Sequence, residues 1–298
     1  MGSALPPYLS KQDWSQRNFT ALVMCSIAFP ILLISILYSV NSIKKPTSSN
    51  NKDDKKTQLN FFSSLQYVFK NNVLFTTCLT IALMNLALSY IGTSAALFNK
   101  YVLRISNQPV SIFGNVLTGE TQSTILQSGS VISSLMFIPF YLKLINKYGV
   151  NTMWRVETTF FSAVCLLNLF VTEFIGGFII VVLVGIAISG LFVLPEILLA
   201  EAIELDNKKT GVKKSGLVYG FNALLIHISA VFIEFGKAFI LNNTNYLQPT
   251  PEVPLPIQPD LAIFGIRTLV SIVPAAIMML SNVILYKRNS SVSHLKNE

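Results

Sequence analysis

Acidic side chains gather where a long apolar stretch of the sequence ends. Residues 178–200 are apolar apart from one serine and one acid, and more acids follow at once, so the set is Glu196, Glu201, Glu204 and Asp206. Two basic residues, Lys213 and Lys214, come before the next apolar stretch. Charge this close to hydrocarbon is expensive, so it usually marks a solute pathway, a gate or a packed joint between helices.

These acids have two interpretations each. Glu201 and Glu204 lie three residues apart and share a helix face. They form either a gate that pairs with Lys213 or Lys214, or a set of solvated acids beside the membrane. Glu196 lies deeper in the apolar stretch. It is either a proton-binding or solute-contacting carboxylate, or an interfacial acid that reaches water.

Further polar residues fall inside other apolar stretches. His227 is accompanied on the same stretch by Asn222, and Glu234 and Lys237 are spaced to pair within one helix turn. Residues that could line a polar cavity with His227, or hydrogen-bond between helices instead, are Asn85, Tyr90 and Gln127.

The composition places these residues in a membrane. The chain has 298 residues, of which 52% are hydrophobic and 12% charged, about half the charged share of soluble domains. The net charge of +8 comes from short basic runs between apolar spans, so nucleic acid is not expected as a partner. The sequence has no recognisable catalytic triad, zinc motif or phosphate loop, so we expect neither an enzyme nor a cofactor beyond a coupling cation.

Seven stretches are long and apolar enough to be membrane helices. They lie at about 19–41, 72–97, 123–146, 153–172, 176–200, 217–241 and 262–286. We therefore predict an all-α polytopic membrane protein. Residues 1–41 form its first helix with a short exoplasmic N-terminus, and residues 42–70 a flexible cytoplasmic linker with an amphipathic lead-in. Residues 71–288 form a six-helix bundle, and residues 289–298 a cytoplasmic tail.

The distribution of basic residues predicts the orientation in the membrane. Sixteen Lys and Arg residues fall on one side of these spans and four on the other. The richer side is expected to be cytoplasmic, which places the C-terminus there, in the plasma membrane or an endomembrane. Asn242, in an Asn-Asn-Thr sequon on the opposite side, is then a candidate glycosylation site.

The residues around the acids resemble a known family. Residues 194–206, followed by 210–220, resemble the joint between the tenth and eleventh helices of the glycoside–pentoside–hexuronide:cation symporters, a branch of the major facilitator superfamily. Residues 61–73, 99–103, 143–149 and 258–274 are similar, in order, to other segments of the same half. The resemblance implies helices six to twelve of a twelve-helix transporter.

The resemblance also implies roles. Glu201 and Glu204 stand at the family's acidic positions, Lys213 replaces its arginine, Ser215 its glutamate, and His227 occupies a position that is often basic. The function expected is symport of a small, sugar-like or other organic solute with Na⁺ or H⁺, with lipid and a missing amino-terminal bundle or partner subunit as neighbours. The alternative is a non-transporting membrane interaction or scaffold protein derived from such a transporter.

Overall fold

The described part of the chain is a bundle of long helices. The computed structural model describes residues 61–105, 110–112, 115–117, 119–211, 214–249, 253 and 255–296. The predicted span at 19–41, the predicted linker at 42–59 and the candidate residue Lys213 lie outside these residues.

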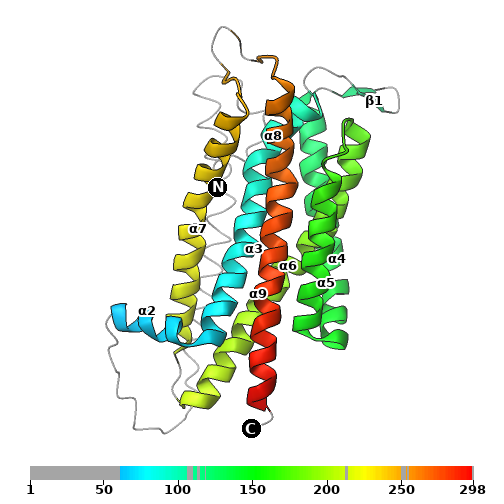
Figure 1. Ribbon diagram of the computed structural model, residues 1–298. Helices are drawn as coiled ribbons and strands as arrows, with labels where there is room; N and C mark the ends of the chain where they lie inside the picture. Colours follow the sequence, from blue (N-terminus) through cyan, green and yellow to red (C-terminus); the bar gives the residue numbers. More distant parts are fainter. Residues whose placement is uncertain are drawn as a thin grey trace, which may run out of the picture. The chain divides into compact units, whose positions relative to one another are not determined.

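Eight α-helices form this part of the protein (Figure 1). They are α2 (Phe61–Lys70), α3 (Asn72–Leu97), α4 (Gly119–Tyr148), α5 (Val150–Leu167), α6 (Phe174–Thr210), α7 (Ser215–Asn243), α8 (Asp260–Val270) and α9 (Ile272–Lys296). A π-helical turn, η2 (Phe98–Val102), continues α3, and a small antiparallel hairpin of β1 (Val110–Ile112) and β2 (Asn115–Leu117) precedes α4. We call the end of the bundle at which α9 ends the lower end, as drawn in Figure 1.

The prediction of an all-helical membrane protein is confirmed. Five helical segments of the described residues are long and apolar enough to cross a membrane: Asn72–Val102, Thr121–Tyr148, Phe174–Thr210, Ser215–Asn243 and Asp260–Tyr286. The predicted span at 153–172 corresponds to the shorter helix α5, which falls outside this set. Arg155 and Glu157 in its first half make α5 less apolar than its neighbours.

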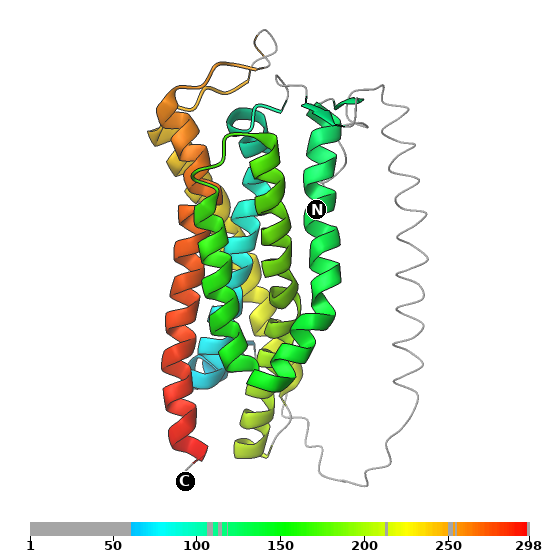
Figure 2. The same ribbon diagram turned by 90° about the vertical axis from the view of Figure 1, so that its right-hand side faces the viewer.

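Two helices form the centre of the bundle. Half of the residues in the most apolar stretches of α3 and α6 are buried, whereas in α7 the buried share is 6%. A helix that is apolar on every side must lie in a core or in lipid. Here α6 packs against α4 and α5, while α3 packs against α9 and α7 (Figure 2). Thus α7 lies at the edge of the described bundle with much of its surface uncovered.

Helix ends follow local sequence signals. The helix α6 continues ten residues beyond the predicted span and ends at Gly211, whose φ of 69° is readily adopted by glycine. Because of this extension, Glu201, Glu204 and Asp206 belong to a continuous helix. Helix α4 bends in its lower half, where Pro139 removes a backbone donor (Figure 2).

The last predicted span is divided into α8 and α9 at Ser271. Pro274 has no N–H to donate to the Val270 carbonyl, and its ring disfavours a straight helix there. The Ser271 hydroxyl donates to the Arg267 carbonyl at 2.5 Å, so it satisfies one of the carbonyls that the break frees.

Candidate functional site at the lower end and on α7

Asp206 is the centre of a polar junction at the lower end of the bundle. The short helix α2 lies across this end, and its Tyr67 hydroxyl donates to the two Asp206 carboxylate oxygens at 2.8 and 2.7 Å. The Asn71 side-chain amide donates to Asp206 Oδ1 at 2.7 Å. Asp206 is only 4% exposed, so this buried carboxylate is stabilised by donors from the α2–α3 corner.

Asn71 links this junction to the start of α3. Its side-chain oxygen accepts hydrogen bonds from the backbone N–H groups of Val73 and Leu74, at 3.1 and 3.3 Å, which makes it the N-cap of the helix. The Asn71 side chain therefore caps the N-terminus of α3 and also donates a hydrogen bond to the Asp206 carboxylate on α6.

Lys214 completes the junction from the other side. Its ammonium lies 3.6 Å from the centre of the Tyr67 ring, a cation–π geometry. Burial, together with the hydrogen bond to the Asp206 carboxylate, raises the pKa of Tyr67 to about 12. Together these contacts join α2, α3, α6 and the residue before α7.

The other predicted acids occupy different environments. Glu204 forms an ion pair with Lys208 at 2.7 Å within α6, and both side chains are exposed. The expected pairing of Glu204 with Lys214 is not formed, because Lys214 is directed to Tyr67. Glu201 has one buried carboxylate oxygen without a hydrogen-bond partner among the described residues, whereas Glu196 is exposed on α6.

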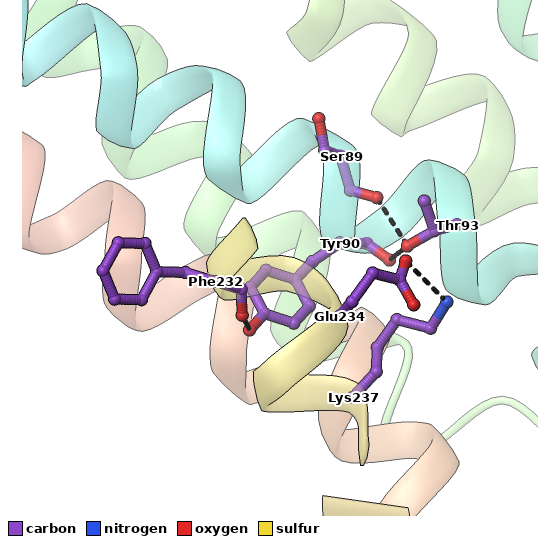
Figure 3. A network of polar contacts seen from close by, with 6 residues as sticks. All are labelled: Ser89, Tyr90, Thr93, Phe232, Glu234 and Lys237. Atoms are coloured by element: carbon purple, nitrogen blue, oxygen red, sulfur yellow. Dashed lines mark hydrogen bonds and ion pairs between the residues drawn. The ribbon is translucent and has the colours of Figure 1, made fainter. Parts of the chain in front are cut away.

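Helices α3 and α7 contact each other through Tyr90, higher in the bundle (Figure 3). The Tyr90 hydroxyl donates to the Phe232 carbonyl at 2.8 Å, and it lies against Gly236, where a Cβ atom would overlap with it. The predicted pair of Glu234 and Lys237 is present at 3.4 Å beside this contact. Tyr90 is therefore an interhelical hydrogen-bond donor, the second of the two roles considered for it.

One line of exposed residues along α7 consists of small and ionisable side chains. It is formed by exposed residues at helical spacing, and we call it the open stripe: Gly216, Gly220, Ala223, His227, Ala230 and Glu234. Among the described residues, no atom outside the local backbone lies within 4 Å of the place where a Cβ would stand on Gly216 or Gly220. The stripe thus combines small residues with His227 and with Glu234, whose side chain is 72% exposed.

The remaining cavity candidates have different surroundings. Asn85 donates to the Ile81 carbonyl of its own helix at 3.0 Å. Gln127 is exposed on α4, which packs against α5 and α6. Asn222 has a buried side-chain oxygen without a hydrogen-bond partner among the described residues.

Sequence reasoning missed Glu157, which is the most completely buried acid of the described residues. Glu157 lies on α5 and is 0% exposed, and neither of its carboxylate oxygens has a hydrogen-bond partner of good geometry among the described residues. An acid inside a predicted span was the available signal. The adjacent Arg155 made the segment look like a membrane interface.

An open cavity of about 470 Å³ lies at the upper end, beside Arg104, Glu173 and Arg267. Arg267 donates through one guanidinium nitrogen to the carbonyls of three residues in the α5–α6 turn, at 3.3, 2.7 and 2.7 Å: Asn168, Leu169 and Val171. These carbonyls follow the end of α5, so Arg267 supplies the donors that they lack.

The helical fold and its five helical segments of membrane length define a multi-pass membrane protein. The chain belongs to the MFS/sugar transport protein family, whose profile matches residues 4–289. A Synechocystis protein described as an uncharacterized symporter is 28% identical to it over 95 residues. That match covers 32% of this chain and 18% of the length of the relative.

Proposed function

We propose that this chain forms the solute-facing carboxy-terminal bundle of a cation-coupled symporter for a small, sugar-like organic solute. The finer assignment to the glycoside–pentoside–hexuronide:cation branch is part of the proposal. So is a cytoplasmic lower end, which the excess of basic residues favours. The family membership supports transport in general, and the symporter relative supports coupling to a cation.

The open stripe of α7 is the observation that carries the proposal. An uncovered helix within a membrane would expose His227 and Glu234 to lipid tails, which is unfavourable for ionisable groups. The small residues of the stripe leave room beside these two side chains. A water-filled path, closed on its far side by a second bundle or a partner subunit, accounts for both features.

The Asp206 junction fits the same function as a fixed connection below the path. It joins α2 and α3 to α6 through a buried carboxylate, so these elements are held together at the lower end. Glu201, with its unpartnered oxygen, lies a little more than one turn above Asp206 on the same helix. We propose Glu201 as the acid that contributes to gating.

The first test is solute uptake by the full chain reconstituted in liposomes. Radiolabelled D-galactose, D-xylose and D-glucuronate represent the three sugar classes of the proposed branch. An inward proton or sodium gradient should increase the uptake of at least one of them, and the variants His227→Ala and Glu234→Gln should reduce it. Uptake at background for all probes with both gradients would favour the alternative of a non-transporting interaction protein.

The second test asks whether the open stripe meets water. In a background without native cysteines, His227→Cys should react at least about tenfold faster with a charged, membrane-impermeant thiol reagent than Ile228→Cys, because thiolates form in water. Ile228 is the matched control, since it lies at nearly the same depth and is also exposed, at 46%, but points away from the stripe. Equal rates would show that the stripe is not a water-facing surface.

A further inference from the structure

Glu157 is a fully buried acid within the bundle, and the Tyr141 hydroxyl on α4 is a polar group near it. Its side chain points between α5, α4 and α6 and is 0% exposed. Neither carboxylate oxygen accepts a hydrogen bond of good geometry from the described residues, although the Tyr141 hydroxyl is near enough to interact with the carboxylate. A buried carboxylate without donors is strongly disfavoured in its ionised form, so the group binds a proton instead.

Among the described residues, no buried positive charge lies beside Glu157. The buried polar residues of the described chain include no lysine, arginine or histidine. Arg155, two residues away on α5, is exposed and lies over the ring of Tyr286 on α9, 5.3 Å from its centre. The ion pairs of the described residues also leave Glu157 out.

The position on α6 that faces Glu157 is a glycine. A Cβ on Gly190 would stand 2.8 Å from Glu157 Cδ and 2.9 Å from Cδ1 of Tyr141 on α4. Both distances are too short for a side chain, so Gly190 makes room for the carboxyl group and the tyrosine ring together. The sequence thus provides a space in which an acid is accommodated between three helices.

Two other polar atoms near the lower start of α5 also lack partners. Asn151 Oδ1 and Trp154 Nε1 are buried without hydrogen bonds among the described residues. Asn151, Trp154 and Glu157 follow one another at intervals of three residues, from the first turn of α5 into the bundle. Polar groups that can bind water therefore line α5 between the lower end and the acid.

We propose that Glu157 is the proton-binding residue of this protein, loaded from the lower end along the Asn151–Trp154 side of α5, and that the coupling ion of the proposed symport is H⁺. This inference rests on the proposed function for its coupling role, although proton binding itself does not. The proton adds to the carboxylate to give a neutral acid, and it leaves by the same group.

A metal cation at this place would need further oxygen ligands besides Glu157. Na⁺ requires several oxygen ligands, as do other hard cations. The described residues contain no group of three acidic, histidine or cysteine side chains that could hold a metal ion. The nearby Thr158 and Ser162 hydroxyls donate to backbone carbonyls of Trp154 and Thr158, at 2.8 and 2.7 Å. A proton needs only the carboxyl group itself.

The titratable groups around Glu157 are few. Tyr141 on α4 interacts with it electrostatically, Arg155 on its own helix is exposed, and Tyr286 on α9 is exposed beneath Arg155. On α6, Glu196 lies six residues beyond Gly190 and is exposed. Tyr141 is therefore the neighbour whose removal should alter proton binding.

The test uses the purified full chain and dicyclohexylcarbodiimide, which modifies protonated carboxyl groups in apolar surroundings. Mass spectrometry of the digested protein should locate the modification at Glu157. Its yield, relative to that at an exposed acid, should fall about tenfold per pH unit above the midpoint. Glu157→Gln should abolish this signal, and Tyr141→Phe should shift the midpoint. The matched control Glu173→Gln, an exposed acid in the α5–α6 turn, should leave the signal unchanged.

Each outcome has one meaning. Absence of labelling at Glu157 at every pH, or protection by Na⁺ at fixed pH, would overturn the proposal. In liposomes, proton-driven uptake that survives Glu157→Gln would overturn the coupling role while leaving the proposed function intact. Uptake at background in the unmodified chain, with labelling that still titrates, would remove the proposed function and leave Glu157 as a proton-binding site.

Discussion

Removal of the Asp206 carboxylate should release α2 from the lower end of the bundle. In Asp206→Ala, the Tyr67 hydroxyl and the Asn71 amide lose an ionised acceptor at 2.7–2.8 Å. A hydrogen bond to a charged group contributes about 1.5–3 kcal/mol, and water replaces part of it at a half-buried tyrosine. We therefore expect the docking of α2 to weaken by roughly 2–4 kcal/mol.

Hydrogen exchange measures this effect locally. A loss of roughly 2–4 kcal/mol increases the opening equilibrium by about 30- to 900-fold, so the amides of α2 should exchange faster by that factor. The amides in the middle of α6 should not change. The matched control is Glu204→Gln, which removes an exposed acid two residues away on the same helix and should leave α2 unaffected.

A second variant separates the two roles of Asn71. Asn71→Ser keeps a side chain that can cap α3 but is too short to reach Asp206, so it should loosen α2 without fraying the first turn of α3. If α2 exchanges at the same rate in Asp206→Ala, Asn71→Ser and the unmodified chain, the junction does not hold α2 and the reasoning is refuted.

Three further predictions concern other described residues. Gly236→Ala should destabilise the protein by about 1–3 kcal/mol in thermal unfolding, because the added methyl group collides with the Tyr90 hydroxyl. Tyr90→Phe in the same chain should recover part of this loss. If the double variant shows the sum of the two single losses in stability, the contact is contradicted. Because the pKa of Tyr67 is raised to about 12 from an ordinary value near 10, its contribution to stability should be complete below pH 10 and lost as the pH rises toward 12. A Tyr67→Phe variant should lack that part of the alkaline loss in a pH series of unfolding temperatures. Asn242 is exposed at the end of α7 and should carry a glycan when the protein is made in a eukaryotic host. A glycosidase should remove this glycan, and Asn242→Gln should prevent it. An unglycosylated chain would argue against an exoplasmic upper end.

The sequence was sufficient to predict the helical elements, because apolar stretches of membrane length have few other folds. It placed α3, α4 and α7 within a few residues of their observed ends. It ended the membrane span at residue 200 and placed Glu201 and Glu204 on a helix, but it did not predict that this helix continues to Thr210, because hydrophobicity alone does not mark the end of a charged helical segment. It also missed the break at Ser271, which depends on how the carbonyls near Pro274 are satisfied.

The candidate site was harder to predict because it depends on contacts between distant segments. Asp206, Glu204 and Glu201 look equivalent in sequence, but only Asp206 meets Tyr67 and Asn71, which lie more than 130 residues earlier. The pair of Glu234 and Lys237 could be predicted, since its partners lie one turn apart. The isolation of Glu157 could not, because it arises from Gly190 and Tyr141 on two other helices.

Arg267 restricts how this bundle can change shape. Since its guanidinium connects α8 to the α5–α6 turn, a shift of α8 away from this turn would leave three backbone carbonyls without their donor. Helix α9 packs mainly against α3 and α5, and a break in the helical hydrogen bonding at Ser271 separates it from α8. The break at Ser271 lies only four residues from the arginine, so the chain on its two sides is attached to the same part of the bundle: α8 through the hydrogen bonds of Arg267 and α9 through its packing against α5.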